Sequence, residues 1–292
     1  MTGTRRFAIE GAAMRLDDAR ESENVEDRRG TGGRGFRPGG AGGLGIGGVI
    51  LLLAVSYYLG VDPSQLLNDS GTSTGGATTG APARPPGSDP AGEFAKKILA
   101  DTEDTWGTIF ERSGQRYSKP VLVLFSDAVD SACGQAAAAT GPFYCPSDRK
   151  VYLDLSFFQE LDRRFGAPGD FAQAYVIAHE IGHHVQNLTG NLASGGGVSR
   201  NRANAQSVRQ ELQADCLAGV WGHEAAARHR LEPGDVEEGL AAAAAIGDDR
   251  LQRESQGRVV PDSFTHGSSA DRVAALTRGL QSGEVAACGL GR

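Results

Sequence analysis

The stretch AYVIAHEIGHHVQNLTG, residues 174–190, holds three of the six histidines of this chain within six positions. Its apolar residues predict a largely buried helix over residues 170–188. On that helix His179 and His183 lie four positions apart and share one face, so both imidazoles can reach one metal ion. Glu180 lies about 100° round the axis, where it can reach a metal-bound water without ligating the metal. His184 points away from the pair, and we expect it to serve packing or the surface.

A second helix decides between a metal site and a helix whose histidines only make buried polar contacts. One large class of zinc peptidases has a Gly and a third His after the first two, but Gln186 and Thr189 occupy those positions and exclude that class. The other large class takes a Glu from a second helix, followed four residues later by an Asp. ELQAD, residues 211–215, fits. Glu211 can ligate, and Asp215 can accept the N–H of a ligand histidine and fix its tautomer.

Composition divides the chain into four expected parts. The net charge of −7 does not favour nucleic-acid binding. Residues 1–40 are polar and predict a disordered tail. Residues 41–60 lack any charge over twenty positions and predict a transmembrane helix; the alternatives are a buried core helix and a cleaved signal peptide. Residues 61–92 are a Gly/Ser/Thr/Pro linker. Residues 93–292 predict one metallopeptidase domain.

The basic residues on either side of residues 41–60 predict a membrane orientation. The arginines that precede this segment include Arg28, Arg29, Arg34 and Arg37, and the nearest basic residue after it is Arg84. The positive-inside rule therefore places the N-terminus in the cytoplasm and the catalytic domain outside it, on a single-pass anchor. The alternative is a catalytic domain in the cytoplasm that acts in protein quality control.

Residue periodicity predicts an α+β domain that is mainly helical and has a small sheet. Strands are expected within residues 119–127 and 150–158. Helices are expected within residues 93–114, 170–188, 204–229 and 237–252.

From HEIGHH and ELQADC outward, the chain resembles the bacterial membrane-anchored neutral zinc metallopeptidases, a family of gluzincin type. The resemblance extends to MRLDDARESENVEDRRG before the anchor, to GPFYCPSDRKVYLDLSFF before the metal helix, and to IGDDRLQ and DSFTHGSSADR near the end. It implies a zincin-like fold, with His179, His183 and Glu211 as ligands of Zn²⁺ and Glu180 as the catalytic residue. The similar text begins at Met14, which leaves open whether residues 1–13 are translated.

These residues predict a membrane-anchored zinc endopeptidase that acts on peptide or protein substrates. Three protein ligands leave the fourth zinc position for water, and Glu180 can accept the proton of that water and pass it to the leaving amine. The negative charge of the transition state needs a second electrophile, for which His266 and Tyr144 are candidates. The alternative function is a non-catalytic metal-binding or scaffold ectodomain that retained the protease fold.

One strand is a candidate for binding the substrate. Residues 150–158 come shortly before the metal helix, where an edge strand could bind an extended peptide by β-augmentation. An ordinary core strand is the alternative, and the sequence does not separate the two.

The four cysteines allow three pairings. We favour Cys133 with Cys145, which closes a short loop, and Cys216 with Cys288, which ties the C-terminal tail to the helix of the third ligand. Four reduced thiols are the alternative if the compartment is reducing.

Overall fold

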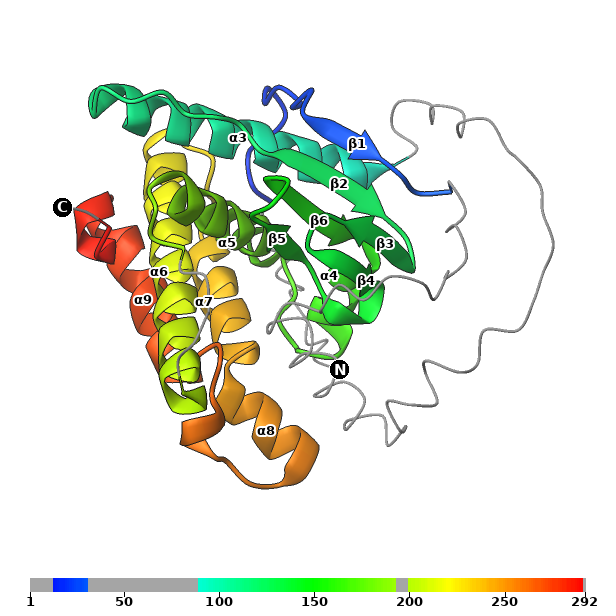
Figure 1. Ribbon diagram of the computed structural model, residues 1–292. Helices are drawn as coiled ribbons and strands as arrows, with labels where there is room; N and C mark the ends of the chain where they lie inside the picture. The colour runs from blue at the N-terminus through cyan, green and yellow to red at the C-terminus, as the bar shows by residue number, and fades with distance from the viewer. Residues whose placement is uncertain (1–12, 31–88, 193–198, 291–292) are drawn as a thin grey trace, which may run out of the picture.

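The computed structural model describes residues 13–30, 89–192 and 199–290 (Figure 1). The transmembrane helix expected over residues 41–60 and most of the linker expected over residues 61–92 lie outside the described residues, and α3 already begins at Pro90. The strands are β1 (Val25–Asp27), β2 (Val121–Phe125), β3 (Ala128–Ser131), β4 (Gly134–Ala137), β5 (Phe143–Cys145) and β6 (Lys150–Asp154). The helices are α3 (Pro90–Arg112), α4 (Ser156–Arg163), α5 (Asp170–Leu188), α6 (Arg200–Ala227), α7 (Asp235–Ala245), α8 (Asp248–Gln256) and α9 (Ser269–Ser282), with 3-10 turns η1 (Ala138–Thr140), η2 (Pro261–Ser263) and η3 (Val285–Cys288).

Helix α5 has the predicted bounds and lies at the centre of the fold. It packs against β5 and helices α3 and α4 on one side and against α6 and α7 on the other (Figure 1). It is enclosed on most of its surface, and its buried residues include Tyr175, Ile177 and Ile181. A polar group on such a helix needs a partner, and the buried histidines of α5 are held by defined contacts.

The sheet has four strands in the order β1-β2-β6-β5. Strands β1, β2 and β6 are parallel, and β5 runs antiparallel to β6. The segment expected as one strand over residues 150–158 is divided, because β6 ends at Asp154 and α4 begins at Ser156. Strand β6 is paired on both sides, so it is a core strand, and the edge strand next to α5 is β5.

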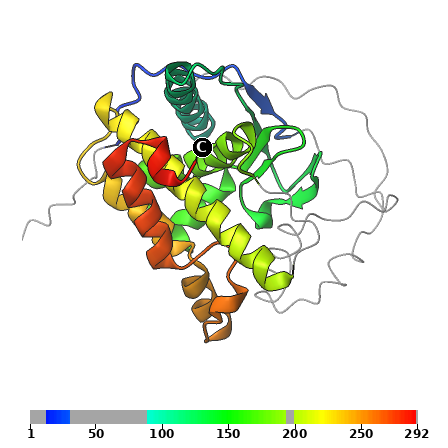
Figure 2. The same cartoon turned by 60° about the vertical axis from the view of Figure 1, so that its left-hand side comes forward.

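Helices α6 and α9 lie side by side on the face of α5 away from the sheet (Figure 2). The helix predicted within residues 237–252 is two helices, α7 and α8, separated at Gly247. A Cβ at Gly247 would lie 2.4 Å from the backbone nitrogen of Ser269, so the chain bends where it passes the start of α9.

Residues 14–30, expected in a disordered tail, pack onto α3 and the sheet. Strand β1 pairs in parallel with β2. The buried Glu103 carboxylate accepts hydrogen bonds from the Ser22 hydroxyl at 2.6 Å and the Asn24 amide at 2.7 Å. Arg20 and Lys119 form ion pairs with the same carboxylate at 3.0 and 3.1 Å. This segment is held by polar contacts and is therefore rich in polar residues. Disordered segments have a similar composition, so composition alone does not distinguish the two.

Two predictions need correction. The described residues form a mixture of helices and small sheets, but the expected zincin-like type of fold is not confirmed and the expected preceding transmembrane helix is not supported. Within residues 13–30, 89–192 and 199–290, every helix is too short or too polar to cross a bilayer.

The predicted membrane orientation is wrong as well. Strand β1 pairs with β2 in one sheet, and Ser22 contacts Glu103 on α3, so residues 14–30 lie on the same side of any membrane as the sheet and α3. A cytoplasmic N-terminal tail with an extracytoplasmic catalytic domain is incompatible with that sheet.

Candidate metal centre

Three side chains from α5 and α6 converge as the sequence predicted. One ligand atom each from His179, His183 and Glu211 lies within 4.8 Å of the other two. Nε2 of His179 is 3.1 Å from Glu211 Oε2, and Nε2 of His183 is 3.6 Å from Glu211 Oε1. The two imidazoles come from successive turns of α5, and the carboxylate faces them from α6.

Asp215 fixes the orientation of His179 through the Nδ1 atom of the ring. His179 Nδ1 lies 2.8 Å from Asp215 Oδ1, an arrangement that leaves Nε2 facing the other two ligands. Asp215 is fully buried, and Arg272 on α9 donates to both of its oxygens at 2.9 Å. The Tyr175 hydroxyl donates to the same carboxylate at 2.5 Å. This network fixes both the tautomer and the ring plane of His179.

Gln186 holds the second histidine in the same way. Its side-chain oxygen lies 2.8 Å from His183 Nδ1. Its side-chain nitrogen donates to the Gln210 carbonyl oxygen at 2.7 Å and to Gln213 Oε1 at 3.0 Å, both on α6. Both histidines therefore present Nε2 to one point.

The charges of the site are strongly coupled. Burial lowers the pKa of His179, but Asp215 and Glu211 outweigh burial and raise that pKa to about 10. Burial raises the pKa of Glu211, but His183 and His179 outweigh burial and hold that pKa well below its usual range. The carboxylate of Glu211 is therefore ionised and available to a cation.

Glu180 has a different environment from its neighbours. It is buried, and its carboxylate makes no hydrogen bond or ion pair with any residue in the described part of the chain. Burial is the main cause that raises its pKa above the ordinary value. An unpaired carboxylate with a raised pKa can take up a proton from a nearby water.

The loop before α9 brings His266 to the edge of the same site. Asp248 at the start of α8 accepts from the backbone N–H groups of Thr265 at 2.7 Å, His266 at 2.6 Å and Gly267 at 3.0 Å. The His266 Nδ1 is 3.2 Å from Asp248 Oδ1. Burial lowers the pKa of His266, but Asp248 and the nearby Glu211 outweigh burial and raise it.

Tyr144 and His184 form a separate network. The Tyr144 hydroxyl lies 3.0 Å from His184 Nδ1 and accepts from the Asn187 amide at 2.8 Å. His184 Nε2 lies 2.6 Å from the Ser118 carbonyl oxygen. Burial lowers the pKa of His184 to about 4, so this ring is neutral. The network joins β5 to α5 away from the ligand face, and His184 is a packing residue.

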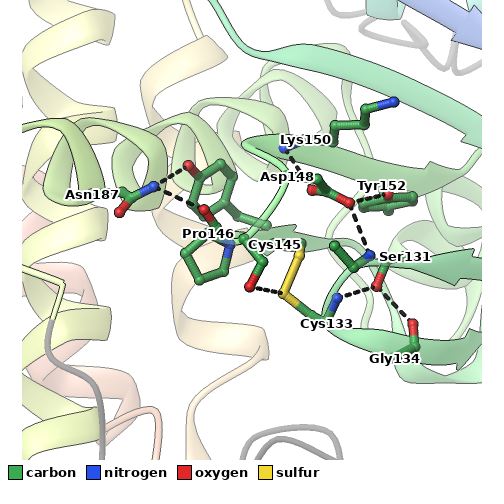
Figure 3. Close-up of a disulfide and its surroundings, with 12 residues drawn as sticks. Ser131, Cys133, Gly134, Cys145, Pro146, Asp148, Lys150, Tyr152 and Asn187 are labelled. Carbon is green, nitrogen blue, oxygen red and sulfur yellow. Dashed lines mark hydrogen bonds between the residues drawn. A yellow bond between two sulfur atoms is a disulfide. The ribbon is translucent and has the colours of Figure 1, made fainter.

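Both favoured disulfides are present. Cys133 is bonded to Cys145, where the β3–β4 turn meets the end of β5 (Figure 3). Cys216 on α6 is bonded to Cys288 in η3. The second bridge is one residue beyond Asp215, so the C-terminal turn is fixed to the helix of the third ligand.

Sequence reasoning missed several residues of this site. Arg272 lies within the quoted DSFTHGSSADR segment, but the sequence does not show which residue this arginine contacts. Gln186 lies three residues after His183, a helical spacing that indicates contact. Asp248 lies in the quoted IGDDRLQ segment, but only the fold shows that it reaches His266.

Two histidines with both Nδ1 atoms engaged and one glutamate are a donor set of the kind found in zinc peptidases. The chain matches the family described as "Putative neutral zinc metallopeptidase" over residues 14–290 and belongs to that family. It is 49% identical over 286 residues to uncharacterized protein YpfJ of Escherichia coli K12, covering 94% of this chain and 98% of that protein. It is 39% identical over 254 residues to uncharacterized protein Rv2575 of Mycobacterium tuberculosis H37Rv, covering 80% of this chain and 84% of that protein. No solved structure matches the chain, and a zincin-like fold is not confirmed.

Proposed function

We propose that this chain is a zinc-dependent endopeptidase with His179, His183 and Glu211 as the metal ligands. The observation that carries the proposal is the convergence of three ligand atoms within 4.8 Å, beside a buried and unpaired Glu180. Two imidazole nitrogens and one carboxylate are a donor set that suits zinc and leaves a position open. When bound, a zinc ion would supply Lewis-acid activation of a water molecule and of the substrate carbonyl.

Glu180 serves as the general base and then as the general acid. Its burial raises the pKa of the carboxyl, which makes it a better proton acceptor. After taking the proton of the attacking water, Glu180 delivers it to the amine of the departing product. The adjacent His179 and His183 carry no such role, because their Nδ1 atoms are held by Asp215 and Gln186.

His266 stabilises the negative charge that develops on the carbonyl oxygen. Asp248 holds its Nδ1 side at 3.2 Å and accepts from its backbone N–H, so the ring has a fixed position. The raised pKa of His266 favours the protonated form that donates to an oxyanion. Tyr144 is the weaker candidate, because its hydroxyl already serves His184 and Asn187.

Strand β5 is the better place for the substrate backbone than β6. Strand β6 is enclosed between β2 and β5, whereas β5 pairs on one side only among the described strands. It packs directly on α5. An extended peptide that adds to the free edge of β5 would run alongside the metal helix.

Substitution of Glu180 separates metal binding from chemistry. We expect purified native protein to carry close to one zinc per chain and to cleave a peptide library. Glu180→Gln should keep the zinc and lose about 10²–10⁴-fold of the peptidase activity, the usual contribution of a general base. His179→Ala should lose the zinc itself.

The matched control is Glu111→Gln on the exposed face of α3, which should leave zinc content and activity unchanged. Full activity in Glu180→Gln would exclude the proposed mechanism. Native protein that binds zinc but cleaves no peptide in the library would favour the alternative of a non-catalytic scaffold.

A further inference from the structure

A second group of acidic side chains lies at the start of α5 and α7. One oxygen each from Asp170, Asp235 and Glu238 lies within 4.8 Å of the other two. No basic side chain within the described ranges forms an ion pair with any of the three. Three carboxylates gathered without a cation repel one another, so this place calls for a positive ligand.

Backbone donors satisfy the group only in part. The Met14 nitrogen donates to Asp170 Oδ2 at 2.7 Å, and the Phe171 nitrogen donates to Glu238 Oε2 at 3.1 Å. Asp235 Oδ2 accepts from the Glu232 nitrogen at 2.8 Å. The other oxygen, Asp235 Oδ1, has no partner among the described residues, although Asp235 is only 1% exposed. A buried carboxylate oxygen without a donor is destabilising, so a donor is missing here.

Burial and mutual repulsion have the expected effect on the acids. Burial, with Asp170 as a further cause, raises the pKa of Asp235 to about 6. Burial also raises the pKa of Asp170 and of Glu238. Burial is the first cause of all three pKa shifts, and repulsion by Asp170 adds to it at Asp235 and Glu238.

We propose that Asp170, Asp235 and Glu238 form a binding site for a free α-ammonium group on Met14. A peptide nitrogen has one hydrogen, and at Met14 that hydrogen already serves Asp170. An α-ammonium in the same place has three hydrogens and a positive charge, enough to supply the missing donor and to offset the acidic group. The preceding residue, Ala13, is exposed, whereas Met14 is 6% exposed, and the family match begins at residue 14.

Two routes can produce this group. Translation can begin at Met14. Alternatively, a peptidase can hydrolyse the bond between Ala13 and Met14, with water supplying the hydroxyl to the Ala13 carbonyl and a hydrogen to the Met14 nitrogen. In either case the ammonium ties residues 14–30 to Asp170, the first residue of the helix that carries His179 and His183.

The first experiment identifies the amino terminus. Protein made from the chromosomal gene with a C-terminal tag is purified, and its intact mass and first residue are measured. We expect Met14 with an unmodified amine that resists acylation until the protein is unfolded. If translation begins at Met1 and the chain is then cleaved, Met1→Leu should abolish the protein that begins at residue 14. If translation begins at Met14, Met1→Leu should have no effect and Met14→Leu should abolish that protein. A product that retains residues before Met14 overturns the proposal.

The second experiment tests the contact. In protein that begins at Met14, Asp235→Asn should lower the melting temperature by roughly 5–10 °C, because it removes one of the carboxylates proposed to bind the buried ammonium. In the 292-residue chain, which has a peptide bond before Met14, the same substitution should have no effect or a stabilising one. Glu111→Gln, exposed on α3 and outside the acidic group, is the control and should change neither form. Equal losses in both forms, or a bound divalent metal that Asp235→Asn releases, would overturn the proposal.

Discussion

Adjacent histidines in α5 have opposite chemistry because their surroundings differ. The His183 ring faces Glu211, and this carboxylate outweighs burial and raises the pKa of the ring. His184, one residue later, faces Ser118 and Tyr144, and burial lowers its pKa to about 4. A change of about 100° round the helix axis thus separates a proposed metal ligand from a neutral packing residue.

We expect His184 to make the protein sensitive to acid. Its folded pKa is about 4 and the ordinary value is 6.5, so the unfolded chain binds the proton more readily. The contribution of the neutral ring is fully present above pH 6.5 and is lost as the pH falls toward 4, by about 3 kcal/mol. Unfolding by urea at pH 7, 5.5 and 4.5 should show this loss in native protein and not in His184→Gln. His229→Gln, at an exposed position, is the control and should lose stability in acid as native protein does. If His184→Gln also loses stability as native protein does, the assignment is contradicted.

The candidate ligands could be brought together from the sequence alone because each pair lies on one helix at a fixed spacing. His179 with His183, and Glu211 with Asp215, are four residues apart on helices that propensity and pattern already indicate. The residues that fix the ligands could not be found this way. Arg272 reaches Asp215 from α9, 57 positions away, and only tertiary packing places it there.

At the scale of elements, two glycines determine how closely α6 and α9 approach. A Cβ at Gly279 would lie 1.9 Å from the Cys216 carbonyl oxygen, and one at Gly219 would lie 2.3 Å from the Leu276 carbonyl oxygen. The backbones therefore touch at this crossing. Arg272 is on α9 and Asp215 is on α6, so the crossing also sets the distance between them.

We expect Gly279→Ala to push α9 away from α6. The new methyl group meets backbone rather than a flexible side chain, so the expected loss of unfolding free energy is about 1–3 kcal/mol. Zinc affinity should fall too, because Arg272 then holds Asp215 less well. The control is Gly107→Ala on α3, where a Cβ meets nothing within 4 Å and should stabilise by about 0.5–1 kcal/mol. Urea unfolding and zinc competition would measure both effects, and a Gly279 variant as stable as the control would contradict this account.

Periodicity located the helices well and their interruptions poorly. Helix α5 has the bounds that its apolar pattern predicted. The pattern over residues 237–252 continues through Gly247, and the break there results from contact with Ser269, which is distant in sequence. The strand expected at residues 150–158 ends early for a related reason, since Asp154 accepts from the Ser156 nitrogen at 2.9 Å and turns the chain into α4.

At the scale of the whole molecule, residues 14–30 and the C-terminal turn η3 are each attached to the rest of the fold, but by different interactions. The N-terminal segment is held by polar contacts to α3 and by pairing with β2. Such contacts leave little trace in composition, which is why the sequence predicted disorder. The C-terminal turn is held covalently, and cysteine spacing made that bond foreseeable.

The two disulfides should differ in their effect on the metal site. Cys216–Cys288 spans 72 residues and joins the C-terminal turn to the helix of Glu211 and Asp215. Cys133–Cys145 spans 12 residues and braces a turn beside β5. Replacing both cysteines of either bridge by Ala should lower the unfolding free energy by about 2–4 kcal/mol. Only loss of Cys216–Cys288 should also weaken zinc binding, because it releases the C-terminal turn from the helix that carries Glu211 and Asp215.

Each double variant would be measured by urea unfolding and by competition with a zinc chelator, with native protein as the reference. The 133–145 variant controls for the general effect of losing a bridge, since Cys133 and Cys145 contact none of the three ligands. If both variants lose zinc to the same extent, global destabilisation explains the loss. If neither does, the network of Asp215, Arg272 and Tyr175 holds the third-ligand helix without help from the covalent bond.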